Sequence, residues 1–414
     1  MFFRKKIGST SVRRHKVSLN LDFDKKRGDF LKQKNVTRVG NSLLSTVGFR
    51  KSPYNVGISR TIARIGDYLV AMTAAKGIYT FNATEPAVSL IEVKDDIISH
   101  VKYQDKLVLS CVKGTYSTTN GMFVEQMTTA YFPSLAVCYD RIFGVNGYDL
   151  SMTAAGDITQ WDDTLKITAH TKLDAVVALD KLYVLGDTCY TLTPDAEEID
   201  MKFVPFGYGI GDVQTESVVT FGKRAIFASS NGLYELKSTA ITPIFTYLND
   251  YVSFDGCVAC AYKGKYYVTC KRKDGELTCN DVMLVLDVNS EQICSVMNVQ
   301  MQHINAAEGS FYAVSDCVLY YMSEEEQVES TYCQTVDFKS TDVKYLDKLT
   351  LRSYTDVDVW VNGNGEKRRY SVQGKCGIQS IPLAGSGRQF DVVVHAPNGL
   401  QLDMLELSAR TYEV

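Results

Sequence analysis

Apolar and polar residues alternate with a period of two in short runs along most of the chain. A clear example spans residues 221–236, where an apolar run at 225–228 is followed by Asn231-Gly232 and a second run from Leu233. Such alternation is typical of β-strands. Asn-Gly favours the positive φ angles of a two-residue hairpin turn. The stretch is therefore predicted to form a β-hairpin whose turn is centred on Asn231-Gly232.

The same sequence of strand, polar turn and strand recurs through residues 50–335. The turns are marked by Asp67, Asp105, Asp140, Asp180, Gly222, Gly264 and Gly309, with successive spacings of 38, 35, 40, 42, 42 and 45. A period near 40 that contains strands alone is typical of β-propeller blades of about four strands each. We predict a β-propeller of six or seven blades. The number of turns favours seven, and the weak pattern of the last unit leaves six open.

This period stops at residue 336, although alternating runs continue to the C-terminus. One of them, at 357–361, leads directly into Asn362-Gly-Asn-Gly365, a strong hairpin signal. Five or six antiparallel strands in a segment of this length are typical of a small β-sandwich. The expected fold is all-β: an extended arm with an entry loop at 1–49, a β-propeller at 50–335 and a C-terminal β-sandwich at 336–414.

Charge is distributed unevenly along the chain. Residues 1–40 hold twelve Lys or Arg and three Asp, a net charge of +9, so the remainder carries −13 within a total of −4. An alternating run at 17–23 indicates that part of this arm pairs as a strand, in its own subunit or in a neighbour. The candidate contact residues are Arg4, Lys5, Lys6, Arg13, Arg14, Lys25, Lys26 and Arg27.

Three interpretations of this basic arm remain open. Its cations can contact nucleic-acid phosphates, dock on the acidic body of a neighbouring copy, or remain solvated. The chain has no run of about 20 apolar residues and no apolar secretory leader at its start. We therefore expect no membrane anchor and synthesis in a cytoplasm. The odd number of cysteines, eleven, favours reduced thiols in that compartment.

No catalytic, cofactor-binding or metal-binding set emerges, so we expect a protein that is not an enzyme. Cys257 and Cys260 have the spacing of half a zinc site, but Cys270 and Cys279 are too far apart to complete it, which favours core thiols. Adjacent acids are interpreted as solvated turn residues, with paired glycosidase carboxylates as the alternative. These acids are Asp95, Asp96, Asp162, Asp163, Glu197 and Glu198.

The layout as a whole resembles the propeller proteins of bacteriophage tails, including the nozzle proteins of short-tailed phages. The resemblance lies in the basic arm, the loop at 38–50, repeats without WD or kelch signatures, and the terminal segments 344–351, 359–363, 387–392 and 402–407. It implies a virion structural protein of the tail, assembled as a closed ring of six copies or a multiple of six around the DNA-exit channel. The implied partners are other copies, further tail or portal-adaptor proteins, and DNA that passes without sequence-specific binding.

Two other functions remain open from the sequence. One is a carbohydrate-binding or carbohydrate-cleaving propeller, for example a receptor-binding tail tip, which requires a cleft with two converging acids or a cluster of exposed aromatic residues at one mouth. The other is a cellular propeller that serves as a scaffold for peptides. The absence of WD and kelch signatures from the repeats makes the cellular scaffold the weaker alternative.

Overall fold

In a computed structural model, the described residues of the chain form β-strands and three short 3-10 helices. The structure describes residues 11–19, 29–55, 62–65, 68–73, 77–82, 89–91, 97–119, 125–193, 201–238, 240–275, 279–307, 309–316, 318–326, 328–338 and 342–413. Within these ranges, no helix is long and apolar enough to cross a membrane. Asp67, one of the predicted turn landmarks, lies outside them, as do the acids at 95–96 and 197–198.

The chain forms two compact units. The repeat unit contains residues 49–292 and 299–323, and the terminal unit contains residues 1–48, 293–298 and 324–414. The structure therefore groups the N-terminal arm with the C-terminal segment. The C-terminal boundary lies at 323/324, ahead of the expected 335/336, because β33 (Ser330–Asp337) pairs along its whole length with β39 (Gln389–Ala396) of the terminal unit.

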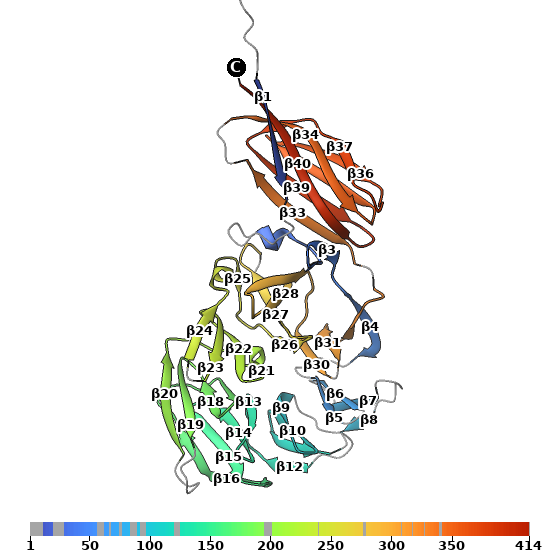
Figure 1. The fold of residues 1–414 in the computed structure, drawn as a ribbon. Helices are drawn as coiled ribbons and strands as arrows, with labels where there is room; N and C mark the ends of the chain where they lie inside the picture. The colour runs from blue at the N-terminus through green and yellow to red at the C-terminus, as the bar shows by residue number, and fades with distance from the viewer. Residues whose placement is uncertain are drawn as a thin grey trace, which may run out of the picture. The chain divides into compact units, whose positions relative to one another are not determined.

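Four-stranded antiparallel sheets follow one another in chain order through the repeat unit, around a common centre (Figure 1). The first sheet contains β5 (Ile62–Ile65), β6 (Tyr68–Thr73), β7 (Gly77–Asn82) and β8 (Ser89–Ile91). The second contains β9 (Ile97–Tyr103), β10 (Lys106–Cys111), β11 (Gly114–Thr118) and β12 (Glu125–Thr128). The third contains β13 (Ser134–Cys138), β14 (Arg141–Asn146), β15 (Asp149–Ala154) and β16 (Asp157–Thr168). The fourth sheet contains β17 (Ala175–Ala178), β18 (Leu182–Leu185), β19 (Thr188–Thr193) and β20 (Lys202–Tyr208). The fifth contains β21 (Val219–Phe221), β22 (Arg224–Ser229), β23 (Gly232–Lys237) and β24 (Ala240–Ile244).

The last part of the repeat unit joins its two ends. β27 (Lys265–Arg272) pairs with β25 (Val252–Ser253), β26 (Ala259–Tyr262) and β28 (Val282–Asp287). The final sheet has the order β30 (His303–Ala307), β31 (Ser310–Ser315), β32 (Val318–Ser323) and β4 (Gly48–Asn55). Its edge strand β4 therefore comes from the N-terminal side of the repeats. Helices η2 (Thr215–Ser217) and η3 (Thr246–Asp250) lie between sheets in the sequence.

Neighbouring sheets bury both faces of their middle strands. All four residues of β18 are buried. Leu182 and Val184 belong to a core cluster with Phe143 of β14, whereas Tyr183 belongs to a cluster with Phe227 of β22. This two-sided burial explains why such strands appear in the sequence as continuous apolar runs.

The six predicted landmarks that the structure describes lie in turns between the first and second strands of their sheets. Tyr139 and Asp140, with φ of 49° and 54°, form the two-residue turn between Cys138 and Arg141. Lys263 and Gly264 form the equivalent turn between β26 and β27, with φ of 47° and 73°. Paired positive φ angles match the right-handed twist of the flanking strands.

The prediction for the turn at Asn231-Gly232 is wrong by one residue. Ser229 pairs with Gly232, so the central residues are Ser230 and Asn231, and Gly232 begins β23 with a φ of 127°. A Cβ atom on Gly232 would lie 2.5 Å from Nδ2 of Asn249, which donates a hydrogen bond to the Asn231 carbonyl at 2.9 Å. The glycine thus permits the close approach of a side chain from η3.

The terminal unit contains two sets of paired strands. The first is the sheet β33–β39–β35–β36, with β35 (Val357–Gly363) and β36 (Glu366–Val372). Its hairpin confirms the signal at 362–365: Gly363 pairs with Glu366, and Asn364 and Gly365 have φ of 50° and 83°. Inward positions such as Val359 and Val394 are fully buried.

The second set is built around β40 (Gln401–Glu413). Its remaining members are β1 (Ser11–Ser18), β2 (Val36–Val39), β3 (Ser42–Ser45), β34 (Lys344–Ser353), β37 (Gln379–Pro382) and β38 (Ser386–Gly387). Strand β29 (Gln292–Met297) pairs with β2, and η1 (Asp29–Lys32) precedes β2. β40 pairs with β34 along one edge, and with β3 and then β1 along the other (Figure 1).

Candidate functional site

The basic arm forms a strand on the last strand of its own chain. β1 pairs antiparallel with β40 along its whole length, from Ser11 opposite Glu413 to Ser18 opposite Glu406. The prediction that part of the arm pairs as a strand is confirmed, but the strand begins at Ser11 and includes only the first two residues of the run at 17–23. Arg13 and Arg14 are exposed on it. The other six candidate residues, Arg4, Lys5, Lys6, Lys25, Lys26 and Arg27, lie outside the described residues.

One carboxylate pairs with one of the two arginines that meet at this junction. Arg14 lies directly opposite Arg410 in the ladder, an arrangement that is unfavourable for two like charges. Asp347, at the bulge in β34, forms an ion pair with Arg410. The hydrogen bond from Arg410 lowers the pKa of Asp347 below its usual value, and the charge of Arg14 lowers it further. Asp347 therefore joins β34 to β40 through its ion pair with Arg410, and its charge offsets part of the repulsion between Arg410 and Arg14.

The arm is anchored on both faces of β1. On one face, the Lys16 ammonium lies 2.7 Å from the carboxylate of Glu406, whose side chain is 5% exposed. On the other, His15 and Thr411 share a hydrogen bond of 2.7 Å, and the His15 ring meets Phe338 edge to face. Sequence periodicity misses the beginning of this strand because a cation and a histidine occupy positions where an apolar residue is expected.

A cavity of about 460 Å³ lies at the centre of the repeat unit. The first strands of successive sheets line it, with β9, β13, β17, β26 and β30 all contributing residues. The acidic residue Glu216 belongs to its lining and forms a 2.9 Å ion pair with His303. Burial lowers the pKa of His100, also in the lining, to about 4, so this histidine is neutral at pH 7.

The side chains that line this cavity favour a structural role for it. Ser134 accepts a hydrogen bond from the Val176 amide at 3.1 Å, which joins the first strands of two sheets. None of the described residues that line the cavity is a lysine or an arginine, so this lining offers no cation to a phosphate. The volume is also far too small for duplex DNA, whose major groove alone is about 12 Å wide.

The cysteines of the described residues are free thiols, and half of them are buried. Burial raises the pKa of Cys257, Cys260 and Cys270 above the usual thiol value, so they are protonated at neutral pH. Cys279 is exposed, and no group of three or more potential metal ligands occurs in the part of the chain that the structure describes. Of the acidic pairs, Asp162 and Asp163 lie within strand β16, so their assignment to a turn is wrong.

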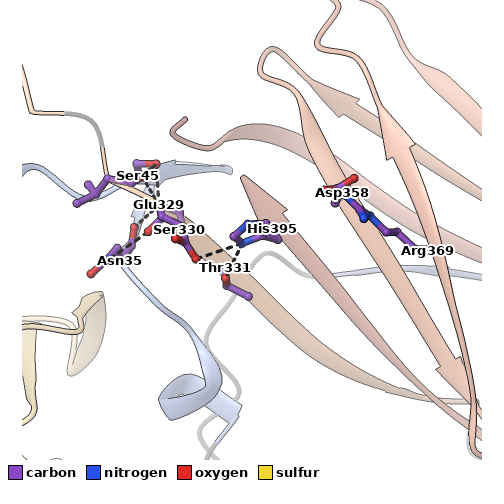
Figure 2. A network of polar contacts seen from close by, with 9 residues as sticks. Asn35, Ser45, Glu329, Ser330, Thr331, Asp358, Arg369 and His395 are labelled. Atoms are coloured by element: carbon purple, nitrogen blue, oxygen red, sulfur yellow. Dashed lines mark hydrogen bonds and ion pairs between the residues drawn. The ribbon is translucent and has the colours of Figure 1, made fainter. Parts of the chain in front are cut away.

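Polar side chains contact one another on the outer face of the sheet β33–β39–β35–β36, and the fully buried Ser330 of β33 makes further polar contacts on the other side of that strand (Figure 2). His395 Nδ1 lies 3.2 Å from the Thr331 hydroxyl and 3.7 Å from Glu329. The neighbouring Ser330 hydroxyl donates to the Asn35 carbonyl at 2.8 Å and lies 2.7 Å from the Ser45 hydroxyl. The network thus ties strand β33 to the segment that contains β2 and β3.

Two further strands extend the polar face. Asp358, opposite His395 in the ladder, accepts a hydrogen bond of 2.6 Å from Arg369 (Figure 2). It accepts a second one, also of 2.6 Å, from the Ser371 hydroxyl. Trp360 lies on the same face, with the Arg369 guanidinium 5.6 Å and the Lys367 ammonium 5.4 Å from its ring centre. No sequence motif marks these residues. The Asn364-Gly365 turn is their one detectable signal, because it fixes which residues of β35 and β36 are opposite one another.

Comparison with known proteins identifies similar folds. No protein-family model and no curated protein sequence matches the chain. Among solved structures it is similar to the Pan2 WD40 domain of Neurospora crassa, with 11% identity, a TM-score of 0.47, and coverage of 70% of this chain and 98% of that chain. It is also similar to BamB of Moraxella catarrhalis, with 12% identity, a TM-score of 0.42, and coverage of 76% and 99%.

A third similar structure is that of the RRP9 WD40 repeats, with 5% identity, a TM-score of 0.49, and coverage of 67% of this chain and 99% of that chain. These neighbours are WD40 and other β-propeller proteins of varied origin, and none of the three is a tail protein. The chain itself has an all-β fold with several four-stranded antiparallel sheets.

Proposed function

We propose that the chain is a structural, non-enzymatic component of a bacteriophage tail, of the nozzle or hub type, that assembles into a closed ring of identical copies around the DNA-exit channel. The observation that carries the proposal is the strand β1, which is joined to the edge of β40 and carries part of a strongly basic arm. A terminal strand seated on a sheet edge can occupy the same place on a neighbouring copy, which is a low-cost route to assembly.

The architecture that we infer is a seven-bladed propeller followed by a β-sandwich. We count six four-stranded sheets and the sheet of β26, β27 and β28 as seven blades among the described strands. In this count, β4 is the outer strand of the blade that contains β30, β31 and β32. The sheet β33–β39–β35–β36 and the strands around β40 supply the two layers of the sandwich. Such rigid β-layers, with no catalytic set in the described residues, suit a structural role.

The DNA channel in this proposal is the lumen of the ring. The cavity inside a single repeat unit is excluded by its volume of about 460 Å³. Outside residues 1–40 the chain carries a net charge of −13. An acidic lumen would repel DNA and allow it to slide, whereas a basic lining would retain it through phosphate contacts.

Exchange of the arm between copies can be tested by cross-linking. Lys16 and Ser408 are partners in the β1–β40 ladder. We would replace both with cysteine in a chain whose exposed Cys279 and Cys376 are changed to serine. Oxidation should then produce covalent multimers on a denaturing gel without reductant, and light scattering of the full chain should give six copies or a multiple of six.

A matched control retains Lys16→Cys but pairs it with Ser371→Cys, which lies on a different sheet, and it should give no multimers. Deletion of residues 1–18 should convert the assembly to smaller species. The proposal of a ring is overturned by a full-length chain that is monomeric and whose cross-linked form also migrates as a monomer.

A further inference from the structure

A cleft of about 550 Å³ in the terminal unit lies between the beginning of β35, the end of β36 and strand β37. We call it the β35–β37 cleft. Its polar lining residues are Asp356, Asp358, Ser371, Gln373, Lys375, Gln379 and Ser380, and its apolar ones are Val357, Val372, Ile381 and Pro397. The cleft is large enough for a small organic ligand and combines an apolar surface with several polar groups, as ligand sites do.

The polar walls are held in place by hydrogen bonds. Asp356 accepts a hydrogen bond from the Gly374 amide at 2.7 Å, and the Lys375 amide donates to the Ser353 carbonyl at 2.9 Å. A Cβ atom on Gly374 would lie 2.5 Å from the Tyr354 carbonyl oxygen, so this segment packs directly on the preceding turn. The Gln379 side chain donates to the Gln373 carbonyl at 2.9 Å. A preorganised wall of this kind reduces the entropy lost on binding.

Asp358 provides a fixed, ionised acceptor. Hydrogen bonds from Arg369 and then from Ser371 lower the pKa of its carboxyl, so it is charged at neutral pH. It lines the cleft and also lies on the same face of β35 as Trp360. Arg369 bridges the two, since it binds Asp358 and covers the ring of Trp360, and its own side chain is 60% exposed.

The balance of these groups selects a class of ligand. Two carboxylates disfavour an anion, whereas Lys375 disfavours a simple cation. Carboxylate, amide and hydroxyl groups together can accept and donate hydrogen bonds to neighbouring hydroxyl groups of one molecule. The aliphatic floor can contact the C–H face of a ring, and Trp360 supplies an aromatic surface beside the cleft.

We propose that the terminal unit binds a short neutral saccharide in the β35–β37 cleft. Asp356, Asp358 and Gln379 contact its hydroxyl groups, and the aliphatic floor supports its ring. A second sugar displaces the Lys367 ammonium from the ring of Trp360, while Arg369 remains bound to Asp358. This inference does not depend on the ring proposed above, because every residue of the cleft belongs to one unit of one chain.

The test is saturation-transfer NMR on the full chain with four separate probes: maltose, lactose, N,N′-diacetylchitobiose and mannobiose. At least one probe should bind with a Kd on the order of 1 mM, a usual strength for a small site with few contacts. Asp356→Asn retains the shape of the side chain and Gln379→Met its length, and each should weaken binding about tenfold. Trp360→Phe should reduce the signal of the second sugar ring more than that of the first.

The control is Glu366→Gln, at the tip of the same hairpin, where the Glu366 side chain forms an ion pair with the exposed Arg368. Its binding should equal that of the unmodified chain, and all variants should retain the same melting temperature. The inference is overturned if none of the four probes transfers saturation at about 10 mM, or if the cleft variants bind as well as Glu366→Gln. A monomeric chain that binds a probe would refute the ring and leave the cleft intact.

Discussion

The two units use the same secondary structure in opposite ways. In the repeat unit, the middle strands are buried on both faces, as the burial of β14 and β18 illustrates. In the terminal unit, β35 and β39 alternate between buried and more exposed residues, so one face of their sheet is available to solvent. The polar groups that can bind a ligand therefore gather on the terminal unit, while the repeats bury their apolar residues against one another.

This contrast predicts a large difference between aromatic truncations in the two units. Phe227 is fully buried and stacks on Tyr234, so Phe227→Ala should lower the free energy of unfolding of the repeat unit by about 3–5 kcal/mol. Trp360→Ala, on the open face, should cost the terminal unit about 1–2 kcal/mol, because it loses two cation–π contacts and partial burial.

The chain has two tryptophans, Trp161 in the repeat unit and Trp360 in the terminal unit, whose emissions overlap. Urea unfolding of both variants is therefore followed by circular dichroism beside the unmodified chain. Equal losses in the two variants would contradict the contrast in burial.

A second pair of substitutions compares backbone constraints. Gly232→Ala places a side chain at a φ of 127° and against the Asn249 amide, so it should destabilise the repeat unit by about 1–3 kcal/mol. Gly377→Ala in the terminal unit meets no atom within 4 Å and should change stability by less than about 0.5 kcal/mol. Thermal unfolding of both variants beside the unmodified chain measures this difference. A neutral Gly232→Ala would show that η3 can move aside.

The smallest expected effect concerns pH and the arm. The folded-state pKa of Asp347 is lowered, so its ionised carboxylate stabilises the fold. This stabilisation is complete at pH values above the ordinary aspartate pKa of about 3.9 and is lost as the pH falls through the lowered value. Amide hydrogen exchange in β1 should therefore accelerate as the pH is reduced below about 4, after correction for intrinsic rates.

Asp347→Asn should accelerate exchange in β1 already at pH 7 and flatten its pH dependence, because the two arginines then lack their shared anion. Asp391→Asn removes a carboxylate charge from the sheet β33–β39–β35–β36, where Asp391 accepts a hydrogen bond from Thr335, and it serves as the control that should leave exchange in β1 unchanged. If Asp347→Asn matches that control, the carboxylate does not hold the arm.

Much of the fold could be predicted because turn chemistry is local. The landmarks at Asp140 and Gly264 identify two-residue turns, and Asn364-Gly365 identifies a hairpin, since these residues accept φ angles that others resist. Gly232 misleads the same reasoning because its φ serves an approach by Asn249, which belongs to η3 on the far side of strand β24 in the sequence. A glycine after a polar residue can mark either a turn with a positive φ or a close approach by another side chain, and the sequence alone does not distinguish the two.

The binding surfaces were beyond prediction for a different reason. Asp356, just before β35, and Gln379, in β37, line the same cleft although these strands belong to different sets. No local sequence pattern indicates that the two residues are close. The strand character of β1 is detectable at Val17, yet its partner β40 lies at the opposite end of the chain. Charge asymmetry identifies the arm as unusual but does not identify the surface on which it docks.

Because β4 pairs with β32, the repeat unit closes only late in synthesis. β4 ends at Asn55 and its partner β32 begins at Val318, so the ribosome releases β4 long before that partner exists. At about 5–20 residues per second, synthesis of the intervening segment takes on the order of 10–50 seconds. The nascent chain must protect an unpaired strand edge throughout that time, and the repeat unit can close only when nearly all of its sequence has been made.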